Sequence, residues 1–172
     1  MNPLLVNVAE LLRRPGSERV VEVDVPLADL GVVDPTRFAS DAEVSVRLRL
    51  DALSDGIVVD GVLRTSWIGV CRRCLVDTSG VVESDVHELY QRIVTATDAF
   101  EIVGEQLDLR PVVRELVLLD APSTPLCRVD CAGLCPNCGI DRNLETCGCE
   151  PPPVDPRWSA LDALKESAES AE

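Results

Sequence analysis

Aromatic side chains are scarce in this chain of 172 residues, which contains two Phe, one Tyr and two Trp. Large rings therefore cannot dominate its core, and valine and leucine must fill it. Because 46% of the residues are hydrophobic, the chain can still build a substantial core. Its length suits one domain with an appendage, or two small domains.

Catalytic motifs are also missing. The chain has one histidine, His87, and shows no phosphate loop, no G-x-G-x-x-G and no Ser/His/Asp grouping. His87 lies in an alternating stretch, where a solvated strand histidine is the default interpretation. The carboxylates are scattered over predicted sheet faces, which is their ordinary arrangement. We therefore expect no catalytic residue, no small-molecule substrate and no enzyme.

Basic segments are absent as well. The chain has 30 Asp and Glu against 16 Lys and Arg, a formal net charge of −14. Acids outnumber bases by 11 to 7 in residues 1–70, 10 to 5 in 71–126, 3 to 2 in 127–149 and 6 to 2 in 150–172. Phosphate contacts supply most of the affinity for nucleic acid, so direct RNA binding is expected to be weak. The acidic field favours a basic protein partner.

The N-terminus lacks a basic region, and its apolar run over 4–9 is only six residues long. That run is too short for a signal peptide or a membrane span, so we expect no membrane association and a cytoplasmic location. In a reducing compartment, paired cysteines are more often metal ligands or redox centres than disulfides.

Cysteine, in contrast, is abundant. The eight cysteines form four tight pairs: Cys71-x2-Cys74, Cys127-x3-Cys131, Cys135-x2-Cys138 and Cys147-x-Cys149. Two thiolates a few residues apart can bind one tetrahedral metal ion from a single turn, so four pairs supply two four-cysteine sites. The sequence therefore predicts two zinc ions, and ligand sets made only of cysteine favour a structural role.

The pairs can be grouped by their spacing. One predicted site contains Cys135, Cys138, Cys147 and Cys149, and Gly139 can adopt the positive φ that lets backbone N–H groups point at the sulfurs. The other contains Cys71, Cys74, Cys127 and Cys131, and its ion would tie the N-terminal domain to the root of the C-terminal segment. An alternative stays open, in which Cys127 or Cys131 joins the first site and one cysteine is free.

Other chemistry is conceivable for the first pair. In Cys71-Arg72-Arg73-Cys74 the two arginines would lower a thiol pKa, as in a redox dithiol. The motif does not open a helix after a strand, as thioredoxin-like sites do. Iron in a four-thiolate site is a weaker option.

Period-two alternation predicts β structure in the first half of the chain. The predicted strands cover 21–25, 43–52, 57–70 and 75 to about 89. Turn residues separate the middle strands at Ser54-Asp55-Gly56. Cys71 and Cys74 therefore lie on a connection between strands, and Gly61 and Gly69 mark bulges or close backbone approach.

Short helices complete the prediction. Asn7 can cap a helix over 8–14, and Asp108 can cap one that runs to about Leu119. After the prolines at 151–153, an amphipathic helix presents one apolar face and either docks back on its own domain or binds a partner. That face comprises Trp158, Leu161 and Leu164.

These elements predict an α+β fold. Residues 1–126 would form an antiparallel β-rich domain, barrel-like or a curved sheet, that carries the first cysteine pair. Residues 127–150 would form a zinc-ribbon-like segment, and 151–172 a proline-rich spacer with the C-terminal helix.

The order of these motifs resembles the bacterial YceD family over nearly the full chain. The matching segments are Val8 to Gly16, Cys71-Arg-Arg-Cys74-Leu75, the run from Cys127 through Cys149 including Asn143-Leu144, and Asp155-Pro-Arg-Trp158 with its following leucines. The resemblance implies a ribosome biogenesis factor that supports synthesis, processing or stability of large-subunit (23S) ribosomal RNA. It brings no established catalytic residue.

The net charge and this resemblance together favour an adaptor or chaperone. We expect its partner to be a basic ribosomal protein or a large-subunit assembly intermediate, rather than bare RNA. The alternative is a thiol redox or metal-responsive switch that uses Cys71 and Cys74.

Overall fold

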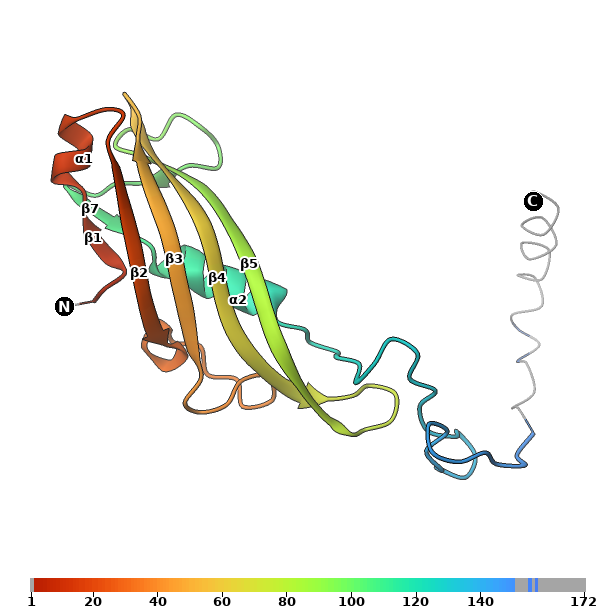
Figure 1. Ribbon diagram of the computed structural model, residues 1–172. Coiled ribbons are helices and arrows are strands. Elements are labelled where there is room, and N and C mark those ends of the chain that lie inside the picture. Colours follow the sequence, from red (N-terminus) through yellow and green to blue (C-terminus); the bar gives the residue numbers. More distant parts are fainter. Residues whose placement is uncertain (1, 151–154, 156, 158–172) are drawn as a thin grey trace.

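A long, curved antiparallel sheet dominates the computed structural model, which describes residues 2–150, 155 and 157 (Figure 1). Its strands follow the chain order: β2 (Glu18–Pro26), β3 (Glu43–Ala52), β4 (Gly56–Val70) and β5 (Asp77–Gln91), with the short β6 (Phe100–Glu101) parallel to β5. β2 and β6 are the two edges of an open sheet. The fold is therefore α+β, and of the two predicted forms it takes the curved sheet, not the barrel.

All four predicted long strands are confirmed. β3 has the predicted bounds, β4 begins one residue earlier, and β2 extends the predicted 21–25 at both ends. The prediction for β5 was wrong at its start, since the strand begins at Asp77 rather than at Leu75. Leu75 has a φ of 60°, because the chain is still turning around the cysteine pair.

The first predicted helix is present but shorter. α1 (Ala9–Arg13) has Val8 at its N-cap position instead of Asn7. The Asn7 side chain still accepts a hydrogen bond of 3.0 Å from the Ala9 N–H, so it supports the first turn from one residue further out.

The second predicted helix is α2 (Arg110–Asp120), and its predicted cap residue also lies one residue before the observed N-cap. Leu109 is its N-cap residue, and the predicted cap Asp108 accepts a 3.0 Å hydrogen bond from the Arg110 N–H. Pro111 lies in the first turn, where proline is tolerated. The Arg110 guanidinium also bonds this carboxylate and lowers the pKa of Asp108.

Four short elements were missed by the sequence analysis, one of which is β6. β1 (Leu5–Asn7) pairs antiparallel with β7 (Gln106–Asp108), and the 3₁₀ helix η1 (Leu27–Leu30) follows β2. Strands of three residues are too short to show an alternating pattern. The β1–β7 pair forms because the chain returns to its own beginning, about a hundred residues later.

The core lies between one face of the sheet and α2, which crosses that face (Figure 1). Val112, Val113 and Val117 of α2 are buried there against inward-facing strand residues. Valine and leucine make up most of the buried side chains, as the composition predicted. Tyr90 stacks on Phe100 with ring centroids 5.2 Å apart, so two of the chain's few aromatic residues join β5 to β6.

Gly61 marks a close backbone approach, as predicted for this position. An ideal Cβ on Gly61 would lie 2.1 Å from the Arg47 carbonyl oxygen on β3, and its φ is 152°. A side chain cannot fit between these two strands. The glycine therefore lets β3 and β4 pair through the middle of the sheet.

The cysteine-rich segment lies at the far end of the β4–β5 hairpin, after an extended stretch that follows α2 (Figure 1). The predicted helix with Trp158, Leu161 and Leu164 lies outside the described residues. The boundaries 1–126, 127–150 and 151–172 stay predictions.

Candidate metal centres

All eight cysteine sulfurs gather in two clusters of four. The first tetrad is Cys71, Cys74, Cys127 and Cys131, and the second is Cys135, Cys138, Cys147 and Cys149. Within each tetrad the sulfurs lie within 4.8 Å of one another. This is the grouping that the spacing predicted, and the alternative with one free cysteine is not what the structure contains.

The first tetrad joins the β4–β5 connection to the segment after α2. Its sulfurs are 3.8 Å apart between Cys71 and Cys131 and 3.6 Å apart between Cys74 and Cys127. Four sulfurs at about 2.3 Å from one zinc ion would be about 3.8 Å apart, whereas a disulfide needs about 2.05 Å. The spacing therefore fits a shared tetrahedral ion and not disulfides.

Backbone contacts hold these two parts of the first tetrad together. The Arg72 N–H donates to the Pro125 carbonyl at 3.0 Å, and an ideal Cβ on Gly69 would lie 2.9 Å from the Pro125 ring. The chain leading to Cys127 thus crosses directly over the end of the hairpin. Cys71, Cys74 and Cys131 are 0%, 6% and 2% exposed, whereas Cys127 is exposed, so three of the four thiols of this centre are buried although it lies at the end of the sheet.

The two C-x2-C knuckles have the same backbone geometry. In the first, the Leu75 N–H donates to the Cys71 carbonyl at 2.9 Å and Leu75 has a φ of 60°. In the second, the Gly139 N–H donates to the Cys135 carbonyl at 2.9 Å and Gly139 has a φ of 74°. In each knuckle the N–H of the leading cysteine also donates a 2.8 Å hydrogen bond to the carbonyl five residues later, from Cys71 to Val76 and from Cys135 to Ile140.

Backbone N–H groups point at one sulfur in each tetrad, as the sequence predicted for such knuckles. The N–H groups of Cys127 and Cys74 lower the pKa of the Cys71 thiol to about 6. Those of Cys138 and Asn137 lower the pKa of Cys135 to about 6. Both thiols are therefore predisposed to the thiolate form that a metal ion requires.

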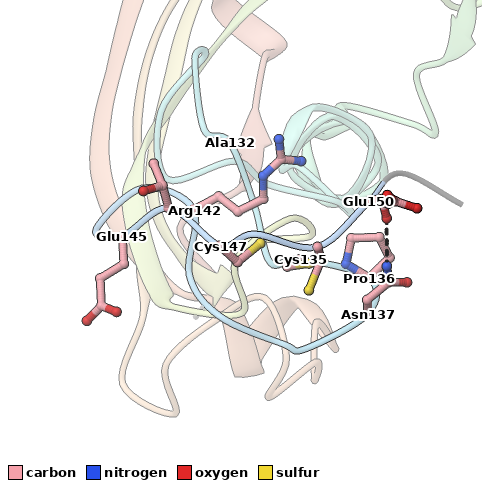
Figure 2. Close-up of a pocket in the computed structure, with 10 residues that line it drawn as sticks. Ala132, Cys135, Pro136, Asn137, Arg142, Glu145, Cys147 and Glu150 are labelled. Carbon is pink, nitrogen blue, oxygen red and sulfur yellow. Dashed lines mark hydrogen bonds between the residues drawn. The ribbon is translucent and has the colours of Figure 1, made fainter.

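The second tetrad is more open to solvent. Cys135 is buried and Cys147 is half-buried, whereas Cys138 and Cys149 are exposed. A hollow of about 450 Å³ lies beside Cys135 and Cys147, and Figure 2 shows Arg142 among the side chains around it. Four thiols without a histidine or carboxylate leave no ligand position for a reactive water, which is the composition of a structural site.

Loop residues close the second tetrad without help from the sheet. The Asn137 side chain donates a 2.8 Å hydrogen bond to the Glu150 carbonyl, drawn as the dashed line in Figure 2. This bond joins the knuckle to the end of the segment that carries Cys147 and Cys149. The second tetrad is therefore a local, zinc-ribbon-like unit.

Asn143 links the two tetrads, a role that the sequence analysis missed. It lies on the loop between Cys138 and Cys147, yet its Nδ2 donates to the Cys131 sulfur at 3.5 Å. Its Oδ1 accepts the Ala132 N–H at 2.8 Å and the Arg128 guanidinium at 2.7 Å. The loop of the second tetrad thus supports the polypeptide around a ligand of the first.

Arg73 makes a second link. Its guanidinium donates to the Cys131 carbonyl at 2.9 Å, and its own carbonyl accepts the Leu134 N–H at 2.9 Å. The sequence analysis considered Arg73 only as a modifier of thiol pKa. In the structure, Arg73 connects the hairpin end to the segment between the tetrads through these two hydrogen bonds.

The lone histidine is not part of either centre. His87 lies on β5 with 83% of its side chain exposed and pairs with Asp60 on β4. This is the solvated strand histidine that the sequence predicted.

Among the described residues, no helix is long and apolar enough to cross a membrane.

The chain is similar to proteins of a known family. The family model described as large ribosomal RNA subunit accumulation protein YceD matches residues 59–165, more than half of the chain. A relative from Mycobacterium bovis, named an uncharacterized protein, is 32% identical over 167 residues, which cover 93% of this chain and 80% of the relative. One from Mycobacterium leprae, also named uncharacterized, is 28% identical over 169 residues, or 94% of this chain and 77% of the relative. No solved structure matches the chain. The chain therefore belongs to the YceD family of large ribosomal RNA subunit accumulation proteins.

Proposed function

We propose that the protein is a non-enzymatic ribosome biogenesis factor that supports synthesis, processing or stability of large-subunit (23S) ribosomal RNA. The observation that carries this proposal is the family match, which extends from β4 through α2 to both tetrads. The family is named for the accumulation of that RNA. A cytoplasmic location belongs to the same proposal.

Two structural zinc ions are the second part of the proposal. The residues fit the metal, because each tetrad offers four thiols, and two sulfur pairs of the first lie at the 3.6 and 3.8 Å expected in a zinc tetrahedron. Zinc in the first tetrad would hold the hairpin end against residues 127–131. Zinc in the second would order the loop from Cys135 to Cys149.

The factor acts mainly through protein contacts rather than on bare RNA. Its net charge of −14 opposes phosphate binding, and two zinc ions with eight thiolates would lower that charge by a further four units. A basic ribosomal protein, or an assembly intermediate that presents one, suits this field. Direct RNA binding is weak in this proposal.

A thiol switch is the second candidate, because the pKa of Cys71 is lowered to about 6. A reactive thiolate also has to be reached by its oxidant, and Cys71 is 0% exposed. Rapid, reversible oxidation of Cys71 and Cys74 by mild peroxide, accompanied by zinc release, would favour the switch.

Deleting the gene in its own bacterium tests the main proposal. Large-subunit ribosomal RNA should fall relative to small-subunit RNA, and the wild-type gene should restore it. A tagged chain should also retain large-subunit precursors or one identified basic ribosomal protein at low salt, and lose it as salt rises. Unchanged RNA ratios in the deletion strain would overturn the proposal.

Metal analysis tests the zinc component separately. The purified chain should contain two zinc ions, and a serine at Cys71 or Cys127 should remove the same one. A coloured, iron-containing chain would contradict zinc.

A further inference from the structure

We infer that an apolar patch at the far end of the β4–β5 hairpin docks a basic protein. The inference rests on the proposed function and names the surface and the chemistry of its partner. The patch consists of five side chains with exposed fractions between 39% and 65%: Ile68, Val70, Leu75, Val76 and Val81. No comparable group of exposed large apolar side chains occurs along the rest of β4 and β5.

The hairpin register brings Ile68, Val70 and Val81 to one face, and Leu75 and Val76 lie in the turn that follows Val70. Ile68 pairs with Ser79 and Ser66 pairs with Val81, so Ile68 and Val81 are diagonal neighbours on the face away from α2. Val70 is two residues further along the same face. A groove of about 630 Å³ runs beside Ile68 and Val70, with the loop at Pro35 and Thr36 as its other wall. The patch therefore offers both a surface and a hollow for an anchoring side chain.

Leu75 is the most informative member of the patch. It occupies the left-handed conformation that glycine occupies at the equivalent position of the second knuckle, Gly139. A non-glycine residue in this conformation is strained, and such residues cluster at binding sites. The leucine gains little burial in return, since it is 64% exposed. A partner contact explains why a large apolar side chain stands at a position that suits glycine.

Charge identifies the partner. The patch is continuous with the sheet face that points away from α2, where β2 to β5 present nine carboxylates and three arginines. The carboxylates belong to Glu18, Glu22, Asp24, Glu43, Asp51, Asp60, Asp77, Glu83 and Asp85, and the arginines are Arg47, Arg49 and Arg64. Two of these arginines already pair with carboxylates of the same face, Arg49 with Asp51 and Arg64 with Glu83. The face thus complements a basic protein that carries an exposed apolar anchor, and it repels RNA.

The first tetrad holds this surface in shape. Leu75 and Val76 directly follow Cys74, and the Val76 carbonyl accepts the Cys71 N–H at 2.8 Å. The turn that presents both side chains is therefore the turn that presents two of the four thiols. Binding at the patch should require an intact first tetrad but not an intact second one.

Binding measurements with large-subunit ribosomal proteins test the inference. The probe is the total protein extracted from purified large ribosomal subunits of the same bacterium, applied to the immobilised full-length chain. Each basic protein retained is identified and purified, and its Kd is measured. Leu75→Asn removes the apolar side chain but keeps a residue that tolerates the left-handed conformation. Val81→Ser removes the apolar side chain on the strand face. Leu144→Asn is the control, because Leu144 is 82% exposed outside the patch.

We expect Leu75→Asn and Val81→Ser each to raise Kd at least tenfold, with Leu144→Asn within twofold of wild type. Zinc content should stay at two ions and the thermal midpoint should not fall, which excludes unfolding as the cause. If the patch variants bind the same basic protein as tightly as wild type, the docking inference is wrong and the proposed function stands. If wild type binds none of these proteins, the docking inference is also wrong, and RNA levels in the deletion strain decide the proposed function independently.

Discussion

The two cysteine knuckles share one backbone geometry but stand in different surroundings. The first connects two 15-residue strands, and Cys71 and Cys74 within it are buried. The second connects loops, and its Cys138 is exposed. The first is therefore supported by the sheet whether or not a metal binds, whereas the second has a few loop hydrogen bonds and would gain most from a bound ion.

This difference suggests a division of labour. The first centre joins parts of the chain more than fifty residues apart and shapes the end of the sheet. The second is local, and Asn143 and Arg73 are its links to the first. The contrast leads to four testable expectations.

Replacing one ligand in each centre should separate the two most strongly. Cys71→Ser should remove one zinc ion and lower the thermal midpoint of the sheet by about 10 °C, because the hairpin end loses its attachment to residues 127–131. Cys138→Ser should also remove one ion but leave that midpoint within about 2 °C. Metal analysis and calorimetry measure both quantities. Equal midpoints for the two variants would contradict the division.

In the metal-free chain, Cys71 should make the stability of the sheet depend on pH, whereas Cys135 should not. The pKa of Cys71 is lowered to about 6, whereas an unfolded cysteine titrates near 9. Between these values the unfolded chain binds more protons, so stability should rise from about pH 6 to pH 9 and be lost as pH falls through 6. Urea unfolding of the sheet should show this rise in the wild type. Cys71→Ser should flatten it and Cys135→Ser should not.

Removing the link between the centres should have a moderate effect. Asn143→Ala deletes the hydrogen bond to the Cys131 sulfur and should weaken zinc binding in the first tetrad about tenfold, as for other residues that orient metal ligands. Asn137→Ala is the matched control, since its bond to the Glu150 carbonyl lies within the second tetrad. Competition with a chromogenic chelator measures both affinities. Unchanged zinc affinity of the first tetrad in Asn143→Ala would show that the centres are independent.

Exchanging the residues after the knuckles should have the smallest effect. Leu75→Gly should stabilise the chain by up to about 1 kcal/mol, because glycine adopts a φ of 60° without strain. Gly139→Ala should destabilise the second centre by a similar amount. Chemical denaturation and zinc affinity report the two changes. Destabilisation by Leu75→Gly would mean that the leucine contributes to the fold itself.

The sequence was informative wherever a local pattern repeats. Alternation along 43–52 predicted the bounds of β3, and turn residues placed the first cysteine pair between strands. β5 was misjudged at its start because Leu75 and Val76 are apolar and look like strand residues, although they form the turn. β1 and β7 were missed because three residues carry too little periodicity.

The pairing of the cysteines, the acidic charge and the period of the strands follow from residue type and spacing, so they can be read directly from the sequence. Three features became visible only in the folded chain: the sheet stays open, Asn143 reaches Cys131, and Leu75 takes a conformation typical of glycine. These features depend on which distant segments meet, and the free energy of that meeting is shared among many residues rather than written in any one motif.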